Sequence, residues 1–224
     1  MNRGIRSYVL RQGRTTPAQQ RALEELLPRY GLPYAPAPIA ARQVFGRDAP
    51  LVLEIGSGMG ETTYEIAAAH PEADFIAVEV HGPGVGSLLN RVSAAGLRNV
   101  RVIRHDAVEV LAHMIAEDTL EAIHIFFPDP WPKKRHHKRR LLQPEFVALA
   151  TRRLVHGGTL HAATDWPDYA DHIKAVLLSE PLLEPAAHGF VERPATKFEA
   201  RGRRLGHPIS DFYFRRREKA PEGR

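Results

Sequence analysis

Residues 51–60 read Leu-Val-Leu-Glu-Ile-Gly-Ser-Gly-Met-Gly, a short apolar run that leads into a loop with three glycines. A run of this length is typical of a strand buried on both faces of a sheet. Glycines let the following backbone turn tightly and approach a ligand closely. Apolar residues then recur at helical spacing over 59–69. The stretch therefore predicts a strand, a ligand-binding loop and a helix.

The same alternation continues toward the end of the chain. Beyond the first strand at 51–56, the pattern predicts strands at 74–80, 100–103, 122–127 and 158–164, and helices at 86–95, 107–116, 144–154 and 169–178. Strands joined by helices form a parallel sheet that is covered on both faces. Residues 209–216 alternate and predict a last, antiparallel strand at or near a sheet edge. The expected fold is α/β, a doubly wound and mostly parallel sheet.

Length and composition favour one domain with appended ends. The chain has 224 residues and no cysteine, which excludes disulfides, thiolate zinc sites and a cysteine nucleophile. We expect a basic arm and linker at 1–50, a domain at 51–217 and a tail at 218–224. In the arm, Pro17 is expected to open a helix, and the proline-rich 31–38 reads as a linker. No apolar run approaches the about 20 residues of a membrane helix, and no secretory signal is visible, so a cytoplasmic location is expected.

The charge of the chain is unevenly distributed. The formal net charge is +5, but residues 51–128 carry 4 basic and 11 acidic residues, whereas residues 129–140 carry 6 basic and 1 acidic. Residues 1–50 and 193–224 are also basic, with 8 against 3 and 10 against 4. Such asymmetry favours a polyanionic partner over a small neutral substrate. The alternative is a solvated surface with biased arginine use.

Acidic residues near the glycine loop favour one cofactor. Glu54 precedes the first glycine by two residues, and Glu79 closes the second strand 19 residues after Gly60. An acid in the place of Glu79 can accept both ribose hydroxyl hydrogens. A carboxylate at Glu54 repels a pyrophosphate and attracts an ammonium group. Because Glu61 stands where a dinucleotide fingerprint has its third glycine, S-adenosylmethionine is favoured over a nicotinamide cofactor.

The predicted cofactor site lies at the carboxyl edge of the sheet. Asp106, just past the third strand, is placed to accept a hydrogen bond from an adenine amino group. The site is expected to contain Glu54, Gly56, Gly58, Gly60, Glu79 and Asp106. A nicotinamide enzyme, or glycines that serve only as turns, is the alternative.

A proline-rich turn follows the fourth predicted strand. Residues 127–132 read Phe-Pro-Asp-Pro-Trp-Pro, and because proline fixes φ, the turn is expected to be rigid. It stands at the carboxyl end of a central strand, where ligands bind in such sheets. We expect Asp129 to point into the site and Trp131 to offer an apolar face to a base. The alternative is a structural turn with a capping aspartate.

The densest basic block of the chain comes directly after this turn. It consists of Lys133, Lys134, Arg135, His136, His137, Lys138, Arg139 and Arg140. Six permanent cations without an acid repel one another unless they meet an anion, and a phosphate backbone is the natural partner. A basic surface loop or a localisation signal is the alternative. Adjacent histidines without acidic or thiol neighbours do not predict a metal site.

Two later segments complete the candidate site. Asp165 lies in Thr-Asp-Trp at 164–166, where the fifth strand ends at the ligand edge. Near the C-terminus, Thr196, Lys197 and Glu199 can hydrogen-bond a base edge, and Phe198 can pack beneath it. From the residues alone, an ordinary polar loop is an equal alternative.

These motifs resemble one family. LEIGSGMG at 53–60, IFFPDPWPKKRHHKRR at 125–140, TDW at 164–166 and TKFEARGRRLGH at 196–207 are similar to the bacterial tRNA (guanine-N7-)-methyltransferase family. Residues 6–14 resemble the family's N-terminal arm, and the likeness spans about residue 5 to about residue 217. The resemblance implies a Rossmann-like class I S-adenosylmethionine-dependent methyltransferase that modifies N7 of guanine 46 in the variable loop of tRNA.

The resemblance also implies roles for single residues. Asp129 would be the catalytic residue and would join the cofactor site. Lys133, Asp165, Thr196, Lys197, Phe198 and Glu199 would hold the substrate, and Arg135, His136, His137, Lys138, Arg139 and Arg140 would contact RNA. Two other functions stay open, namely a methyltransferase for another RNA position or a small molecule, and an RNA-binding protein without catalysis. The sequence does not decide between a monomer and a homodimer.

Overall fold

A seven-stranded sheet forms the centre of the molecule, with the strand order β3-β2-β1-β4-β5-β7-β6. The computed structural model describes residues 7–8, 14–194, 199 and 208–218. The strands are β1 (Leu51–Ile55), β2 (Asp74–Val78), β3 (Val100–Ile103), β4 (Leu120–Phe126), β5 (Leu154–Thr164), β6 (Leu183–Pro185) and β7 (Ser210–Arg216). Strands β1 to β5 pair in parallel, and β7 runs antiparallel to both β5 and β6. The predicted sheet class and its antiparallel last strand are confirmed.

Strand β1 marks the point where the strand order reverses. It pairs with β2 on one side and β4 on the other, so that Glu54 lies level with Ala77 and with His124. In open α/β sheets, ligands bind outside the carboxyl ends of the strands at this switch point. The glycine loop after β1 and the proline turn after β4 both leave the sheet there.

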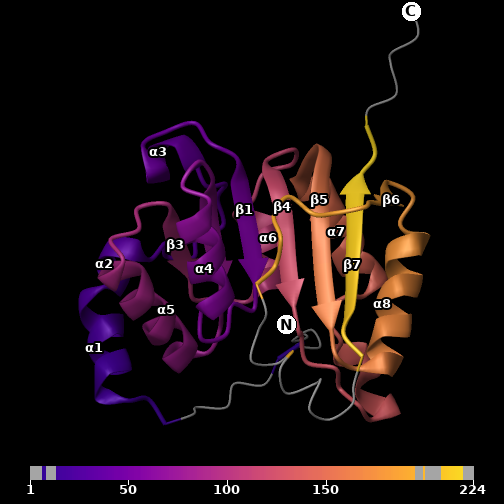
Figure 1. Cartoon of the computed structure of the whole chain (residues 1–224), viewed down its shortest axis with the longest axis horizontal. Helices are drawn as coiled ribbons and strands as arrows, with labels where there is room; N and C mark the ends of the chain where they lie inside the picture. The colour runs from indigo at the N-terminus through magenta and orange to yellow at the C-terminus, as the bar shows by residue number, and fades with distance from the viewer. Residues whose placement is uncertain (1–6, 9–13, 195–198, 200–207, 219–224) are drawn as a thin grey trace, which may run out of the picture.

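Helices cover both faces of the sheet (Figure 1). They are α1 (Pro17–Glu25), α2 (Leu27–Tyr30), α3 (Ala41–Phe45), α4 (Glu61–Ala69), α5 (Gly82–Ala94), α6 (Ala107–His113), the 3₁₀ helix η1 (Lys134–Arg139), α7 (Pro144–Arg153) and α8 (Pro167–Ser179). Helices α1, α4 and α5 pack on one face around Ile66 and Leu88, and α6, α7 and α8 pack on the other around Leu111 and Ile173. The two cores together keep every residue of β1 buried.

The N-terminal helices pack on the body of the molecule. Thr16 caps α1 with a capping box that it shares with Gln19, and Pro17 stands at the first helical position, as the sequence predicts. Helix α1 packs along α5. At the next turn of the chain, Leu32 donates its amide to the carbonyl of Val102 on β3. Among the described residues, no helix has both the length and the apolar character needed to cross a membrane.

Helix α5 starts earlier than predicted, at Gly82 rather than Gly86. Its glycines are needed for close packing, because a Cβ on Gly84 would lie 2.3 Å from the carbonyl oxygen of Gly58, and one on Gly86 would lie 2.6 Å from that of Gln19. The first turn of α5 therefore fits directly beneath the glycine loop and against α1. Glycine's low helix propensity hid this helix start in the sequence.

Smaller differences concern element ends. Strand β5 begins at Leu154 instead of 158, and the helix before it ends at Arg153 instead of 154. The sequence pattern also missed four short elements, α2, α3, η1 and β6. Each has only three to six residues, which is too few to show a period.

Candidate active site

A pocket of about 340 Å³ opens at the carboxyl ends of the parallel strands. Its walls come from the ends of β1, β2 and β4 and from the start of α6. The lining residues include Ile55, Gly56, Val78, Glu79, His105, Ala107, Phe127 and Asp129. The structure thus brings the glycine loop, the second-strand acid and the proline turn to one cavity, at the edge where the sequence places them.

The glycine loop between β1 and α4 depends on backbone that only glycine adopts readily. Gly56, Gly58 and Gly60 all have positive φ, between 55° and 75°. At Gly56 an added Cβ would meet nothing within 4 Å, so the backbone faces open space beside the pocket. At Gly60 it would lie 2.4 Å from the Cβ of Leu88 on α5. The loop is therefore shaped for close approach by a ligand on one side and by α5 on the other.

Glu79 fastens this loop to the end of β2. Its Oε2 accepts a hydrogen bond from the Gly58 amide at 2.8 Å, and its Oε1 accepts one from the His81 amide at 2.8 Å. The side chain is buried and lines the pocket. Each carboxylate oxygen has a second lone pair, so these bonds leave acceptor capacity for the ribose that the sequence predicts at Glu79.

Glu54 is a buried carboxyl at the centre of the same edge. Burial raises its pKa to about 7, and the nearby charge of Glu79 adds to the rise. The neighbouring Thr63 hydroxyl opposes the rise, although it makes no hydrogen bond of good geometry with any described residue. A buried carboxylate is costly unless a cation accompanies it, so this position suits the ammonium group of a ligand.

Two other predicted acids have clear local positions. Asp106 caps the N-terminus of α6, where Oδ1 accepts a hydrogen bond from the Val108 amide at 2.9 Å. Its neighbours His105 and Ala107 line the pocket, so Asp106 stands at the rim. Asp165 follows the end of β5 and is half-buried at the same edge of the sheet.

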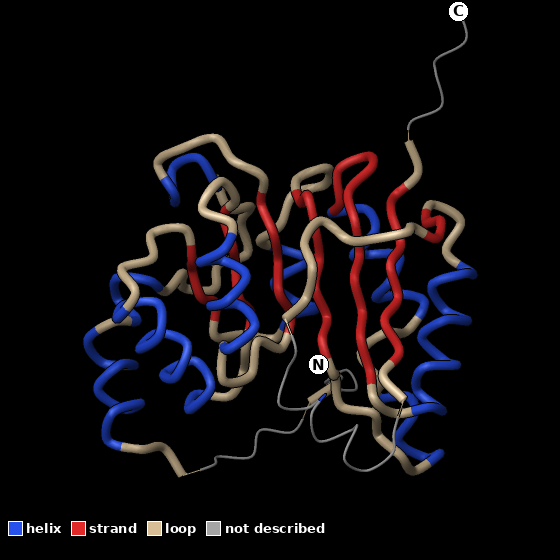
Figure 2. The backbone as a smooth tube through the Cα atoms, viewed as in Figure 1, coloured by secondary structure: helices blue, strands red, loops and turns tan. Residues whose placement is uncertain are grey.

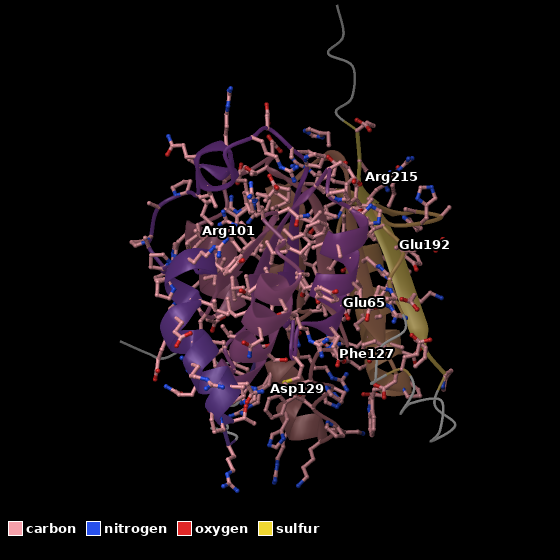
Figure 3. All side chains as sticks on the ribbon, turned by 60° about the vertical axis from the view of Figure 1, so that its left-hand side comes forward. Glu65, Arg101, Phe127, Asp129, Glu192 and Arg215 are labelled. Atoms are coloured by element: carbon pink, nitrogen blue, oxygen red, sulfur yellow. The ribbon has the colours of Figure 1, made fainter. Side chains whose placement is uncertain are left out.

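The proline turn after β4 is held in a strained conformation. Phe127 has φ of 51° and Trp131 has φ of 46°, values that bulky side chains rarely adopt. Such strain costs about 1–3 kcal/mol per residue and gathers at functional sites. Figure 3 shows Asp129 just beyond Phe127 at the carboxyl edge of the sheet. The turn exposes Asp129 beside the pocket.

Trp131 is partly covered by the chain itself. The Arg139 guanidinium lies 4.9 Å from the centre of the indole ring, and His136 meets it edge-on at 5.8 Å. The indole Nε1 donates a hydrogen bond to the Ser7 carbonyl at 3.1 Å. Trp131 therefore links the basic block to the N-terminal arm. That a base stacks on its ring stays a prediction.

Two arm residues belong to the pocket although sequence reasoning gave them no place in it. Ser7 and Tyr8 line the same cavity as the ends of β1, β2 and β4. Their neighbours carry no motif of catalytic type, so the only signal was the resemblance of residues 6–14 to the family's arm. The arm thus contributes to the cofactor side of the site.

Half of the basic block 133–140 is open to solvent, but of the six residues predicted to contact RNA only Arg135 and Lys138 are exposed. Lys133, Lys134, Arg135 and Lys138 are exposed, whereas His136, His137 and Arg139 are half-buried. Residues 134–139 form η1, which holds these side chains close to the Asp129 turn. The three lysines and Arg135 present the solvated cations that a phosphate backbone requires.

Arg140 differs from the rest of the block, because only 2% of its side chain is exposed. Its Nε donates a hydrogen bond to the Pro130 carbonyl at 2.9 Å, and its Nη2 pairs with Asp168. The guanidinium also lies 4.9 Å from the centre of the Tyr169 ring. The predicted RNA contact of Arg140 stays a prediction, and the structure adds a second role, which is to hold the turn that carries Asp129.

Of the residues 196–199 that are predicted to hold the substrate, only Glu199 belongs to the described part of the chain. Thr196, Lys197 and Phe198 lie outside it. Glu199 is 7% exposed and accepts a hydrogen bond from Arg193 at 2.7 Å. It lines a second cavity of about 700 Å³ together with Arg193, Asp211 and Tyr213. Within the described part of the chain, no group of histidines and acids could hold a metal ion.

Comparison with known proteins identifies the family. A family model described as putative methyltransferase matches residues 48–212. The tRNA (guanine-N(7)-)-methyltransferase of Nitrosomonas eutropha is 60% identical over 214 residues, covering 94% of this chain and 96% of that protein. The enzyme of the same name from Aromatoleum aromaticum is 57% identical over 96% of this chain and 85% of its own length. The chain belongs to the tRNA (guanine-N7-)-methyltransferase family.

Solved structures of lower identity confirm the fold. An rRNA methylase from Streptococcus thermophilus matches with a TM-score of 0.53 and 17% identity, over 80% of this chain and 95% of that one. Precorrin-6y C5,15-methyltransferase from Geobacter metallireducens matches with a TM-score of 0.54 and 14% identity, over 93% and 92%. The sheet is that of a Rossmann-like class I methyltransferase, and the methyl donor of this family and fold is S-adenosylmethionine.

Proposed function

We propose that this chain methylates N7 of guanine 46 in the variable loop of tRNA, with S-adenosylmethionine as methyl donor, in the cytoplasm. The observation that carries the proposal is the pocket that joins the glycine loop to the Asp129 turn, with the exposed cations of η1 beside it. The 60% identity to a tRNA (guanine-N(7)-)-methyltransferase supports the choice of base and atom. The choice of position 46 rests on the likeness of the motifs to the family.

The residues present fit the proposed cofactor. Gly56 leaves open space beside the pocket, Glu79 lines its wall, and Glu54 is a buried acid that a ligand ammonium would neutralise. When bound, S-adenosylmethionine supplies an electrophilic methyl group on a sulfonium centre. Glu54 would hold its ammonium group and Glu79 its ribose, and Asp106, at the rim of the pocket, would accept a hydrogen bond from its adenine amino group. Ser7 and Tyr8 would close the pocket from the arm side.

The chemistry demands little proton transfer. Guanine N7 has an in-plane lone pair and no hydrogen, so no base is needed before it attacks the methyl group. The product base is cationic, and a fixed carboxylate beside it stabilises the developing charge. Asp129, on its strained turn, would orient the guanine or the cofactor's ammonium end rather than act as a general base. Catalysis then consists mainly of positioning and electrostatics.

The decisive experiment is methylation of unmodified tRNA with a labelled methyl donor, followed by cleavage specific for 7-methylguanosine. A transcript with 7-deazaguanine at position 46 is the matched control, because it lacks only the N7 acceptor. We expect one labelled site in the normal transcript and none in the control. Label in the 7-deazaguanine transcript would refute the proposed atom. Turnover without tRNA would favour a small-molecule enzyme, and RNA binding without cofactor binding would favour a non-catalytic protein.

Variants of Asp129 test its role. We expect Asp129→Ala to lower kcat by at least about 100-fold, the cost of losing oriented electrostatic stabilisation. Asp129→Asn keeps the hydrogen-bonding shape without the charge. If orientation dominates, its kcat is expected to fall by less than that of Asp129→Ala. S-adenosylmethionine affinity, measured by calorimetry, shows whether the loss lies in cofactor binding. A rate close to wild type for Asp129→Ala would remove Asp129 from the mechanism.

A further inference from the structure

One loop returns across the sheet to the active-site edge. Residues 186–194 follow β6 and pass over β7, β5 and β4 toward the carboxyl ends of the strands (Figure 2). The Phe190 amide donates a hydrogen bond to Thr159 Oγ1 on β5 at 3.1 Å, and Val191 is buried in the core of that face. The loop therefore delivers its last residues to a fixed place beside the end of β4.

Arg193 makes paired contacts at the end of this loop. Its side chain is only 6% exposed. The guanidinium donates to Asp211 through Nε at 3.1 Å and through Nη2 at 3.0 Å, a two-pronged contact. The remaining nitrogen, Nη1, donates to Glu199 Oε2 at 2.7 Å. One planar cation thus joins two carboxylates that stand 12 residues apart in the sequence.

The same cation also rests on the strand that leads to Asp129. The Arg193 Cζ lies 5.2 Å from the centre of the Phe127 ring and 5.8 Å from that of Phe126. Phe127 is the strained residue that opens the turn, and it lines the cofactor pocket. Arg193 itself lines the second cavity with Glu199. It therefore stands between the pocket of the Asp129 turn and the cavity that Glu199 lines.

Asp211 gives this arrangement a rigid anchor. It belongs to β7, and His161 on β5 places its Nε2 2.8 Å from Asp211 Oδ1. Burial raises the pKa of Asp211, but hydrogen bonds from His161 and Arg193 outweigh that effect and bring the pKa to about 2. Asp211 is therefore a fixed anion on the sheet, against which Arg193 is held in one orientation.

We propose that Arg193 is a positioning residue, which sets the distance between the substrate-side Glu199 and the Phe127–Asp129 turn. The inference rests on the proposed function, because it assumes that Glu199 meets the target guanine. An arginine suits this task, since its planar fork serves Asp211 and Glu199 at once while its face lies on Phe127. Neither the charge pattern nor the motifs distinguish this arginine from the others of the chain.

The first test is Arg193→Lys, which keeps the charge and loses the fork. We expect kcat/KM for tRNA to fall by about tenfold to 100-fold, the range of loss for a misplaced reacting group. S-adenosylmethionine affinity is expected to fall by less than kcat/KM, because the variant keeps the glycine loop, Glu54 and Glu79 and meets the pocket wall at the rings of Phe126 and Phe127. Arg215→Lys is the matched control. It also lies on the β7 side, but its side chain is 54% exposed and pairs with Glu184.

The second test asks whether Arg193 acts through Glu199. Glu199→Asp shortens the acid and breaks the 2.7 Å contact without touching Asp211, so it is the variant of choice if Arg193→Lys folds poorly. We expect Glu199→Asp to lose about as much kcat/KM as Arg193→Lys, and the double variant to lose no more than about twofold beyond the worse single one. Unchanged kinetics in either single variant, or multiplied losses in the double one, would overturn the inference. Absence of methyl transfer to tRNA by the wild-type protein would overturn the proposed function as well.

Discussion

The cofactor side and the RNA side of the candidate site are built in opposite ways. On the cofactor side, Glu54 and Glu79 are buried, and three glycines with positive φ bring backbone and α5 into close contact. On the RNA side, Lys133, Lys134, Arg135 and Lys138 are exposed on the short helix η1 and at its N-cap. One side is preorganised for a small ligand, and the other offers solvated charge to a long anion.

The difference shows how each side is expected to obtain affinity. A buried, fixed pocket binds with little loss of conformational freedom but does not tolerate a misplaced atom. Exposed cations bind a polyanion mainly by releasing its counterions, so each contributes little and all depend on salt. A single substitution on the cofactor side should therefore cause a large loss of S-adenosylmethionine affinity, whereas each substitution on the RNA side should cause a small loss of tRNA affinity.

The largest effect is expected from Gly84→Ala. The new Cβ would lie 2.3 Å from the Gly58 carbonyl oxygen, so either α5 or the glycine loop must move. We expect S-adenosylmethionine affinity to fall by about 100-fold, as for other misplacements of about 1 Å. Overpacking should also lower the free energy of unfolding by about 1–3 kcal/mol. Calorimetric titration and urea unfolding measure the two effects.

Two glycines of the same helix provide controls. Gly86→Ala would press on the Gln19 backbone of α1 at 2.6 Å, so it should destabilise the fold and spare cofactor affinity. The new Cβ of Gly82→Ala would meet only the end of the exposed Arg104 side chain, at 2.9 Å. This variant should change neither the stability of the fold nor the affinity for the cofactor. Equal cofactor losses in Gly84→Ala and Gly86→Ala would show that the effect is global rather than local to the loop.

The second prediction concerns the buried charge of Glu54. Folding raises the pKa of Glu54 from 4.5 to about 7. Between these two pH values, Glu54 keeps its proton in the folded protein and has lost it in the unfolded chain. The buried charge of Glu54 therefore lowers the free energy of unfolding. This loss is absent below pH 4.5, grows up to pH 7 and is complete above it. At pH 8, Glu54→Gln should therefore raise the free energy of unfolding by up to roughly 3 kcal/mol. The same variant should weaken S-adenosylmethionine binding by about tenfold, the loss of one charged contact.

The pH profile of binding makes this prediction sharper. In the wild-type protein, S-adenosylmethionine affinity should rise between pH 6 and pH 8 as Glu54 loses its proton, because the carboxylate is the form that attracts an ammonium. In Glu54→Gln this rise should disappear. A destabilised Glu54→Gln protein with unchanged affinity would mean that Glu54 serves the fold and not the cofactor.

The sequence was informative where a residue type follows from the fold. The glycine loop, Glu79 and the Asp129 turn all end strands of a parallel sheet, and such ends meet at one edge, so their common pocket follows from strand order. The start of α5 was misplaced because its glycines oppose helix formation locally and serve packing across 26 residues, from Gly84 to Gly58. Tertiary packing of that kind leaves no local pattern.

The basic block shows a second limit of the sequence. Arg139 and Arg140 look equivalent in a run of cations, yet one is stacked on Trp131 and the other is buried between Pro130 and Asp168. Arg140 is buried because Asp168, in the first turn of α8, pairs with it. The spacing of residues within the block does not predict that contact. Likewise, the contact between Arg193 and the Phe127 ring depends on a loop that crosses three strands.

The third prediction therefore separates Arg140 from its neighbours. Arg140→Ala removes a buried cation with charge-assisted hydrogen bonds and should lower the free energy of unfolding by about 2 kcal/mol. Because Arg140 holds the Pro130 carbonyl, the variant should also lower kcat through the Asp129 turn. Lys138→Ala, at an exposed position of the same block, should change stability by less than about 0.5 kcal/mol. Thermal unfolding of both variants makes the comparison, and equal losses would contradict it.

The smallest effect is expected from one exposed cation of the RNA side. Arg135→Gln removes a single solvated charge from η1 and should weaken tRNA binding only a few-fold at physiological salt. Its signature is the salt dependence, because the removal of one cation from a phosphate should reduce the slope of log K against log salt by about 0.7–0.9. S-adenosylmethionine affinity should stay unchanged, since Arg135 does not line the pocket. Filter binding over a range of salt concentrations measures the slope, and a parallel line for Arg135→Gln would show that this cation meets no phosphate.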